Sequence, residues 1–154
     1  MLRYRKATMS DVDKLAQIRS VFLMEANDIR METEREKMEN ANKAYFITAL
    51  AEDRFAAWLA LDGEKIVATS GLSFYTVPPN VNCADGKVAY IMNMFTFPEY
   101  RKQGIGMELL KRIVEEAKNR GYKKITLNAT DIGRPLYERY GFEDVIGDMA
   151  FYVE

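Results

Sequence analysis

A nearly unbroken apolar run, followed by a glycine-containing turn and an amphipathic helix, constrains the fold of this chain more than any other feature. The run covers residues 90–97 and closes a strand predicted over 87–97; continuous apolarity is typical of a strand covered on both faces. The helix is predicted over 104–120, with Gly121 placed to end it. Its apolar face comprises Ile105, Leu109, Ile113 and Ala117. A strand at 125–129 would complete a strand–helix–strand unit.

The remaining segments also alternate between helix and strand patterns. The first half is predicted to contain a strand at 4–7, a helix capped by Ser10, a helix at 33–53, and a hairpin of 55–61 and 65–75 around Asp62-Gly63. The end of the chain is predicted to contain a short helix at 135–140 and one or two closing strands within 142–154. No repeat or linker divides residues 1–154, so we expect a single mixed α and β domain.

Composition excludes several classes of protein. The chain has 22 basic and 23 acidic residues, so its near-neutral charge favours no nucleic-acid partner. No stretch approaches the roughly 20 apolar residues that span a bilayer, and the first residues lack the pattern of a secretion signal. We therefore expect a cytoplasmic protein without a membrane partner. Cys83 is the only cysteine, which excludes an internal disulfide.

The absence of histidine constrains the chemistry further. It excludes Ser-His-Asp and Cys-His catalysis and the common zinc sites that contain histidine, and we expect no metal. Any acid or base must be a carboxylate, a tyrosine, a lysine, the cysteine, a chain terminus or water.

The segment 98–106, between the buried strand and the amphipathic helix, has the features of a phosphate site. Gly104 and Gly106 remove side chains where the helix begins, which exposes backbone N–H groups at the positive end of the helix dipole. Arg101 and Lys102 add positive charge nearby. No Walker lysine and no third glycine follow, which argues against a kinase and a dinucleotide fingerprint. Taken alone, the glycine pair fits a tight turn equally well.

Three segments resemble the GNAT superfamily of N-acetyltransferases. Arg101-x-x-Gly104-x-Gly106 resembles its acyl-CoA pyrophosphate loop, residues 134–142 resemble its late Leu-Tyr-x-x-x-Gly-Phe signature, and residues 4–12 are similar to its usual start. The resemblance implies an α/β GNAT-like fold, with a central, mostly antiparallel twisted sheet of six to seven strands and about four helices. It also implies acetyl-CoA as cosubstrate and a primary amine as acceptor.

The resemblance also implies roles for matched residues. The backbone of Met94, Phe95 and Thr96 would bind the pantetheine arm and polarise the thioester carbonyl. Backbone amides of Lys102, Gln103, Gly104, Ile105, Gly106 and Met107 would hold the pyrophosphate, with charge from Arg101. Tyr137 matches the tyrosine that protonates the departing thiolate in many relatives; we prefer this to a core aromatic because the surrounding signature matches as a unit. Tyr140 and Phe142 are expected in the core.

The general base stays open. Many relatives carry a glutamate where this chain has Asn93, which can orient a water or the amine, or can equally well serve a strand bulge. Asn128 is expected to orient substrate or cofactor. The candidate bases are Asp131, Glu25 and Glu32, each of which fits a cap or a solvated helix face better.

The acceptor pocket is expected from residues 27–43 and 76–86. Residues 25–34 contain four acidic side chains, which suit a cationic amine, so the partner is predicted to be a small-molecule or peptide amine. The family also makes a homodimer plausible. The competing functions are a non-catalytic acyl-CoA-binding module, which Tyr137 argues against and for which the amide at Asn93 leaves some room, and an interaction protein on the same fold.

Overall fold

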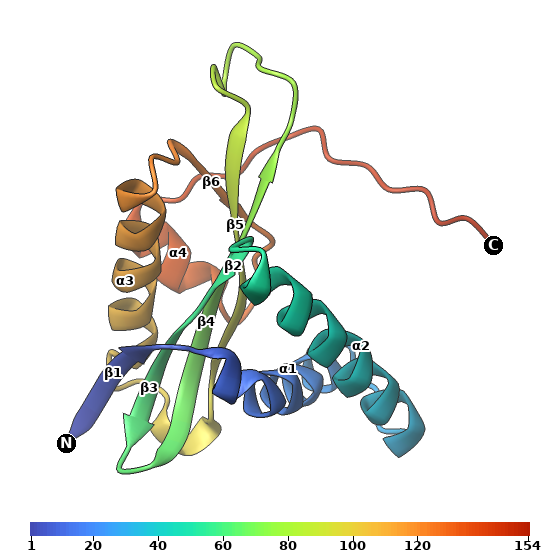
Figure 1. Cartoon of the computed structure of the whole chain (residues 1–154), viewed down its shortest axis with the longest axis vertical. Coiled ribbons are helices and arrows are strands. Elements are labelled where there is room, and N and C mark those ends of the chain that lie inside the picture. Colours follow the sequence, from blue (N-terminus) through green and yellow to red (C-terminus); the bar gives the residue numbers. More distant parts are fainter.

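A six-stranded sheet runs through the computed structural model, which describes residues 1–154 (Figure 1). Its strands are β1 (Leu2–Lys6), β2 (Phe55–Ala56), β3 (Trp58–Asp62), β4 (Lys65–Thr76), β5 (Lys87–Thr96) and β6 (Lys124–Leu127). The strand order is β1-β3-β4-β5-β6, with β2 paired to β4, and only β5 and β6 are parallel. The helices are α1 (Val12–Ala26), α2 (Glu32–Ala51), α3 (Ile105–Asn119) and α4 (Arg134–Tyr140). The predicted fold class is confirmed.

Helices cover both faces of the sheet. On one face, α1 and α2 pack Leu15 and Phe46 against Leu59, and all three side chains are fully buried. On the other face, α3 packs against β4 and β5, with α4 beside it. The apolar face predicted for α3 is buried throughout, as its helical spacing requires. None of the helices is long and apolar enough to cross a membrane, and the cytoplasmic location stays a prediction.

The predicted helix cap at Ser10 is wrong. Ser10 lies inside a short 3₁₀ turn, Met9–Asp11, that precedes α1. The amide of Thr8 donates to the Asp11 carboxylate (2.8 Å), and the Ser10 hydroxyl contacts the Thr8 hydroxyl instead of the helix. An acid three residues after a threonine favours this reciprocal arrangement.

The closing strands predicted within 142–154 are also wrong. This segment forms no helix or strand, and it runs away from the sheet (Figure 1). Ile146 and Phe151 are 99% and 89% exposed. Apolar residues favour a strand only where another strand is available to pair, and this tail meets none.

The Arg5–Asp11 ion pair connects β1 to the start of α1, and its removal is expected to destabilise the fold. Two guanidinium nitrogens of Arg5 donate to the nearly buried Asp11 carboxylate at 2.8 Å each, and these bonds hold the pKa of Asp11 below its ordinary value. Asp11→Ala should lower the free energy of unfolding at neutral pH by about 1–3 kcal/mol. Because the pKa of Asp11 is lower in the folded protein than in the unfolded chain, the ion pair stabilises the fold at pH values above the ordinary carboxyl pKa. This stabilisation is lost as the pH falls through the pKa of the folded state.

Urea unfolding near pH 7 and pH 3 tests this. The difference between wild type and variant should shrink toward the lower pH. Asp13→Ala is the control, because its pair with Lys43 is exposed to solvent and should contribute little to stability. An equal difference for Asp11→Ala at both pH values would contradict the prediction.

Candidate functional site

The sheet opens at a bulge in β5. The parallel pairing of β5 with β6 ends at Ile91 and Leu127, and the register between β4 and β5 shifts between Thr69 and Gly71. Asn93 lies at this shift, with a φ of 58° that few residues other than glycine adopt. Bulges bend a strand and increase its twist. Beyond Ile91, one edge of β5 therefore has no partner strand.

A cleft of about 1060 Å³ occupies this opening. α1, β5, the loop before α3, the start of α3 and the segment from 128 to 139 line it. Every predicted site residue except Gln103 lies on the cleft, namely residues 93–96 and 104–107, Arg101, Lys102, Asn128 and Tyr137. The Gln103 side chain turns back to the carbonyl of Glu99 (3.3 Å).

Free backbone amides gather at one end of the cleft. None of the amides of residues 102–107 donates a hydrogen bond within the chain, and the first helical bond of α3 runs from Glu108 to the Gly104 carbonyl. Lys102 and Gly104 have positive φ (61° and 82°), which turns the amides toward one concave side. A Cβ on Gly104 would meet no atom within 4 Å, so no other part of the chain packs against this position, which lines the cleft. The arrangement suits a phosphate group.

Gly106 serves packing. A Cβ at this position would lie 3.3 Å from Cδ2 of Leu136 on α4, a tighter contact than most. Its small size therefore lets α3 and α4 approach closely at the edge of the cleft.

Arg101 is engaged within the chain. Its Nε donates to the Thr96 carbonyl (2.8 Å), its Nη2 pairs with Glu25 (3.2 Å), and its guanidinium lies over the Phe95 ring (5.5 Å). The side chain thus ties the loop to β5 and α1. Lys102 also lines the cleft and forms no ion pair within the chain. A direct bond from Arg101 to a phosphate stays a prediction.

Tyr137 presents a protonated phenol to the cleft. The residue is 8% exposed, and burial, together with the neighbouring Tyr90, raises its pKa to about 12. No group of the chain bonds to its hydroxyl, although the ring packs against Phe142 (6.0 Å between centroids). The phenol therefore stays neutral at physiological pH and is free to donate a hydrogen bond to a ligand.

Asn93 places an unsatisfied amide in the same cleft. The side chain is 1% exposed, and neither its Oδ1 nor its Nδ2 has a partner, while its backbone carbonyl accepts from the Thr69 hydroxyl (2.8 Å). An unpaired buried amide costs free energy, so water or a ligand is expected to satisfy it. The bulge interpretation of Asn93 holds for its backbone, while the orienting role of its side chain stays a prediction.

The expected acceptor region is wrong. Of residues 27–43, only Asn27 lines the cleft, and no residue of 76–86 does. The pairing of Thr76 with Lys87 places the 76–86 loop beyond the far end of β4 and β5 (Figure 1), about 20 Å from Asn93 at 3.4 Å per residue. The buried Cys83 belongs to this distant loop.

The two candidate bases from the first half of the chain, Glu25 and Glu32, each already pair with an arginine. Glu32 binds Arg35 on the outside of α2, and Glu25 lines the cleft but is paired with Arg101. Asp131 lines the cleft without an ion pair, which leaves it as the free carboxylate there. Asn128, directly after β6, donates to the Tyr90 hydroxyl within β5 at 3.4 Å.

Residue-by-residue interpretation of the sequence missed Arg19 and Tyr90, both of which line the cleft. A signal for Arg19 was present: it lies four residues after Leu15 and three before Phe22, so the helical spacing places a cation on the buried face of α1. Tyr90 was assigned to the apolar run of β5 without regard to its hydroxyl.

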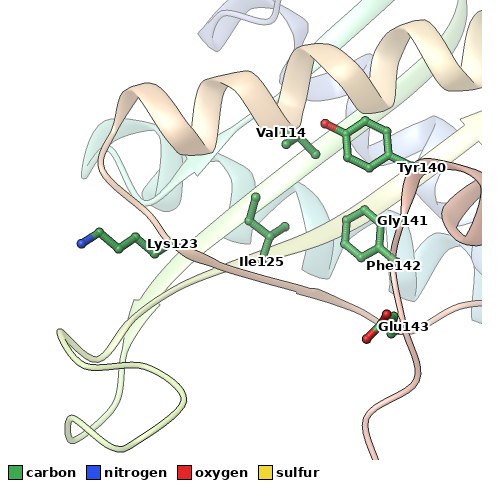
Figure 2. Close-up of a pocket in the computed structure, with 7 residues that line it drawn as sticks. All are labelled: Val114, Lys123, Ile125, Tyr140, Gly141, Phe142 and Glu143. Carbon is green, nitrogen blue, oxygen red and sulfur yellow. The ribbon is translucent and has the colours of Figure 1, made fainter.

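A second, shallower groove lies between α3, β6 and the end of α4. Figure 2 shows the rings of Tyr140 and Phe142 beside Val114 and Ile125, with Lys123 and Glu143 at its rim. Tyr140 and Phe142 are partly buried against the α3 side of the core, which confirms their expected packing role. The groove contains none of the predicted site residues, whereas the cleft contains all but one of them, so the cleft is the candidate active site.

Comparison with known proteins identifies the family. The family model described as "Acetyltransferase (GNAT) family" matches residues 15–142. A crystal structure of a predicted acetyltransferase with acetyl-CoA from Clostridium acetobutylicum is 35% identical, with a TM-score of 0.91 over 99% of this chain and 96% of that one. A GCN5-related N-acetyltransferase from Ralstonia eutropha JMP134 is 26% identical, with a TM-score of 0.90 over 99% of both chains.

Curated relatives match a shorter part of their own length. Human N-acetyltransferase 8B is 27% identical over 129 residues, which cover 82% of this chain and 52% of the relative. Mouse thialysine N-epsilon-acetyltransferase is 32% identical over 57 residues, covering 37% of this chain and 34% of the relative. The chain spans about half the length of the first of these and a third of the second.

Proposed function

Because this chain belongs to the acetyltransferase (GNAT) family, we propose that it transfers the acetyl group of acetyl-CoA to a primary amine by direct attack in a ternary complex. One observation carries the proposal: the free backbone amides of residues 102–107 and the unbonded hydroxyl of Tyr137 share one cleft. The first group suits a pyrophosphate, and the second suits a departing thiolate.

The residues present fit acetyl-CoA along the length of the cleft. The amides of 102–107, with Lys102, hold the pyrophosphate at the positive end of α3. The edge of β5 at residues 94–96 has no partner strand, although Arg101 holds the Thr96 carbonyl. The rest of this edge accepts the pantetheine arm as an added strand would pair. An N–H on this edge donates to the thioester carbonyl, where negative charge develops during attack. When bound, acetyl-CoA supplies the activated acyl group.

Attack requires a neutral amine, whereas an alkyl ammonium has a pKa of roughly 10.4. The free Asp131 carboxylate and a water bound at the Asn93 amide provide a route for the proton. Tyr137 acts on the other product. Full proton transfer from a phenol of pKa about 12 to a thiolate is uphill, so its contribution begins as a hydrogen bond that stabilises the thiolate.

Calorimetric titration with CoA and acetyl-CoA, followed by a free-thiol assay across an amine panel, tests this function. Tight binding with thiol release on an amine supports it. Binding without release on any amine favours the non-catalytic acyl-CoA-binding module. No binding at all favours an interaction protein and contradicts the proposal.

We further propose that the protein forms a homodimer through its C-terminal part. β6 has a single neighbour and so presents an open edge, and the tail exposes apolar residues that no part of its own chain covers. Sedimentation analysis should find a dimer of the full chain, and Phe151→Asp should shift it toward monomer. A monomer at micromolar concentration would contradict the prediction.

A further inference from the structure

We propose that the acceptor amine also carries an anionic group, a carboxylate or a phosphate, and that Arg19 binds it. The inference rests on the proposed function and narrows its substrate class. It narrows the expectation, drawn from the acidic residues of 25–34, that the acceptor is a cationic amine.

Arg19 is held in place with its binding groups free. Its Nε donates to Oδ1 of Asn42 on α2 (2.8 Å), which fixes the guanidinium on the cleft. Neither of its terminal nitrogens forms a hydrogen bond within the chain, and no carboxylate lies within ion-pair distance. Burial lowers the pKa of Arg19, and the nearby Tyr90 and Tyr45 phenols partly oppose this. A half-buried cation without a counter-ion is costly unless a ligand supplies one.

The position of Arg19 matches the acceptor side of the proposed site. Arg19, Tyr90 and Tyr137 line the same cleft, and Tyr90 partly opposes the lowering of the Arg19 pKa and contributes to raising the pKa of Tyr137. Phe22, one turn further along α1, packs against Phe95 of β5 (5.9 Å between centroids). Arg19 therefore lies on the part of α1 that packs on β5 and lines the cleft.

The charges on the cleft favour an anion at this wall. Glu25, the acid that α1 contributes, is already neutralised by Arg101. Asp131 belongs to the segment after β6. A guanidinium presents paired N–H donors that match the two oxygens of a carboxylate or phosphate, so Arg19 provides orientation as well as charge.

Matched pairs of amines test the inference. Lysine is compared with cadaverine, which lacks the carboxylate, and phosphoethanolamine with ethanolamine, in a thiol-release assay at saturating acetyl-CoA. We expect the anionic member of at least one pair to have the higher kcat/KM by about 10- to 100-fold, as hydrogen bonds to charged groups provide. The pair that shows the preference identifies the group as carboxylate or phosphate.

Variants assign the preference to the residue. Arg19→Met should lower the kcat/KM for the anionic amine of a pair to the value for the neutral amine of that pair. The KM for acetyl-CoA and the kcat/KM for the neutral amine should not change. Arg19→Lys should keep part of the preference, since it retains charge without the fork. Arg3→Met on β1, whose exposed side chain lies outside the cleft, is the control. If Arg19→Met does not fold, the inference is still tested by the comparison of paired amines in the wild type and in Arg19→Lys.

Thiol release without any preference for the anionic member, or a preference that persists in Arg19→Met, would overturn the inference and leave the proposed function standing. Absence of release from every amine would instead contradict the proposed function, and this inference with it.

Discussion

Tyr137→Phe is expected to lower kcat by about 100-fold or more, with little change in the affinity for acetyl-CoA. General acid–base groups commonly contribute 10²–10⁴-fold, and the hydroxyl is the only polar atom that this substitution removes. The ring packing against Phe142 is retained, so the protein should fold normally. Single-turnover measurement of thiol release, with calorimetry for affinity, separates the chemical step from binding.

Tyr140→Phe is a matched control, because it removes a hydroxyl from the same helix, in the groove of Figure 2 and outside the cleft. Its rate should remain that of the wild type. Since burial raises the pKa of Tyr137 to about 12, the phenol is protonated across the working range, and its ionisation should cause no fall in kcat below about pH 11. A wild-type rate in Tyr137→Phe would remove its proposed role.

The parts of the fold that were predictable depend on local sequence. The apolar run of β5 and the apolar face of α3 can both be recognised from residues close together in the sequence. The parallel pairing of β5 with β6 follows because a strand–helix–strand connection places its two strands parallel in one sheet. The glycine turn was equally visible, because the backbone conformation at Gly104 restricts the residue type there. Most of the phosphate end of the site was therefore predictable.

The acceptor side depends on contacts that sequence spacing does not encode. The partner of Arg101, Glu25, lies 76 positions earlier in the chain, and Asn42 meets Arg19 only because α1 and α2 pack together. The long pairing of β4 with β5 carried the expected acceptor loop away from the cleft. Strand propensity in the tail could not reveal whether a partner strand is available.

Gly104→Leu is expected to weaken acetyl-CoA binding by about 100-fold or more. The new side chain would stand on the lining of the cleft beside the free amides and crowd a phosphate bound there. The loss of even two hydrogen bonds to a charged group, at about 1.5 kcal/mol each, accounts for that factor. Calorimetric titration measures the change in affinity.

The same substitution also strains the backbone, so stability must be separated from blockage. Gly121 ends α3 as Gly104 begins it, with φ of 83° against 82°, and it lies outside the cleft. Gly121→Leu should therefore lose a similar 1–2 kcal/mol of unfolding free energy while keeping wild-type affinity. If both variants lost affinity equally, strain in α3 would explain the effect, and the free amides would no longer be required as the phosphate site. If only Gly104→Leu lost it, the space in front of those amides must be the space that the ligand occupies.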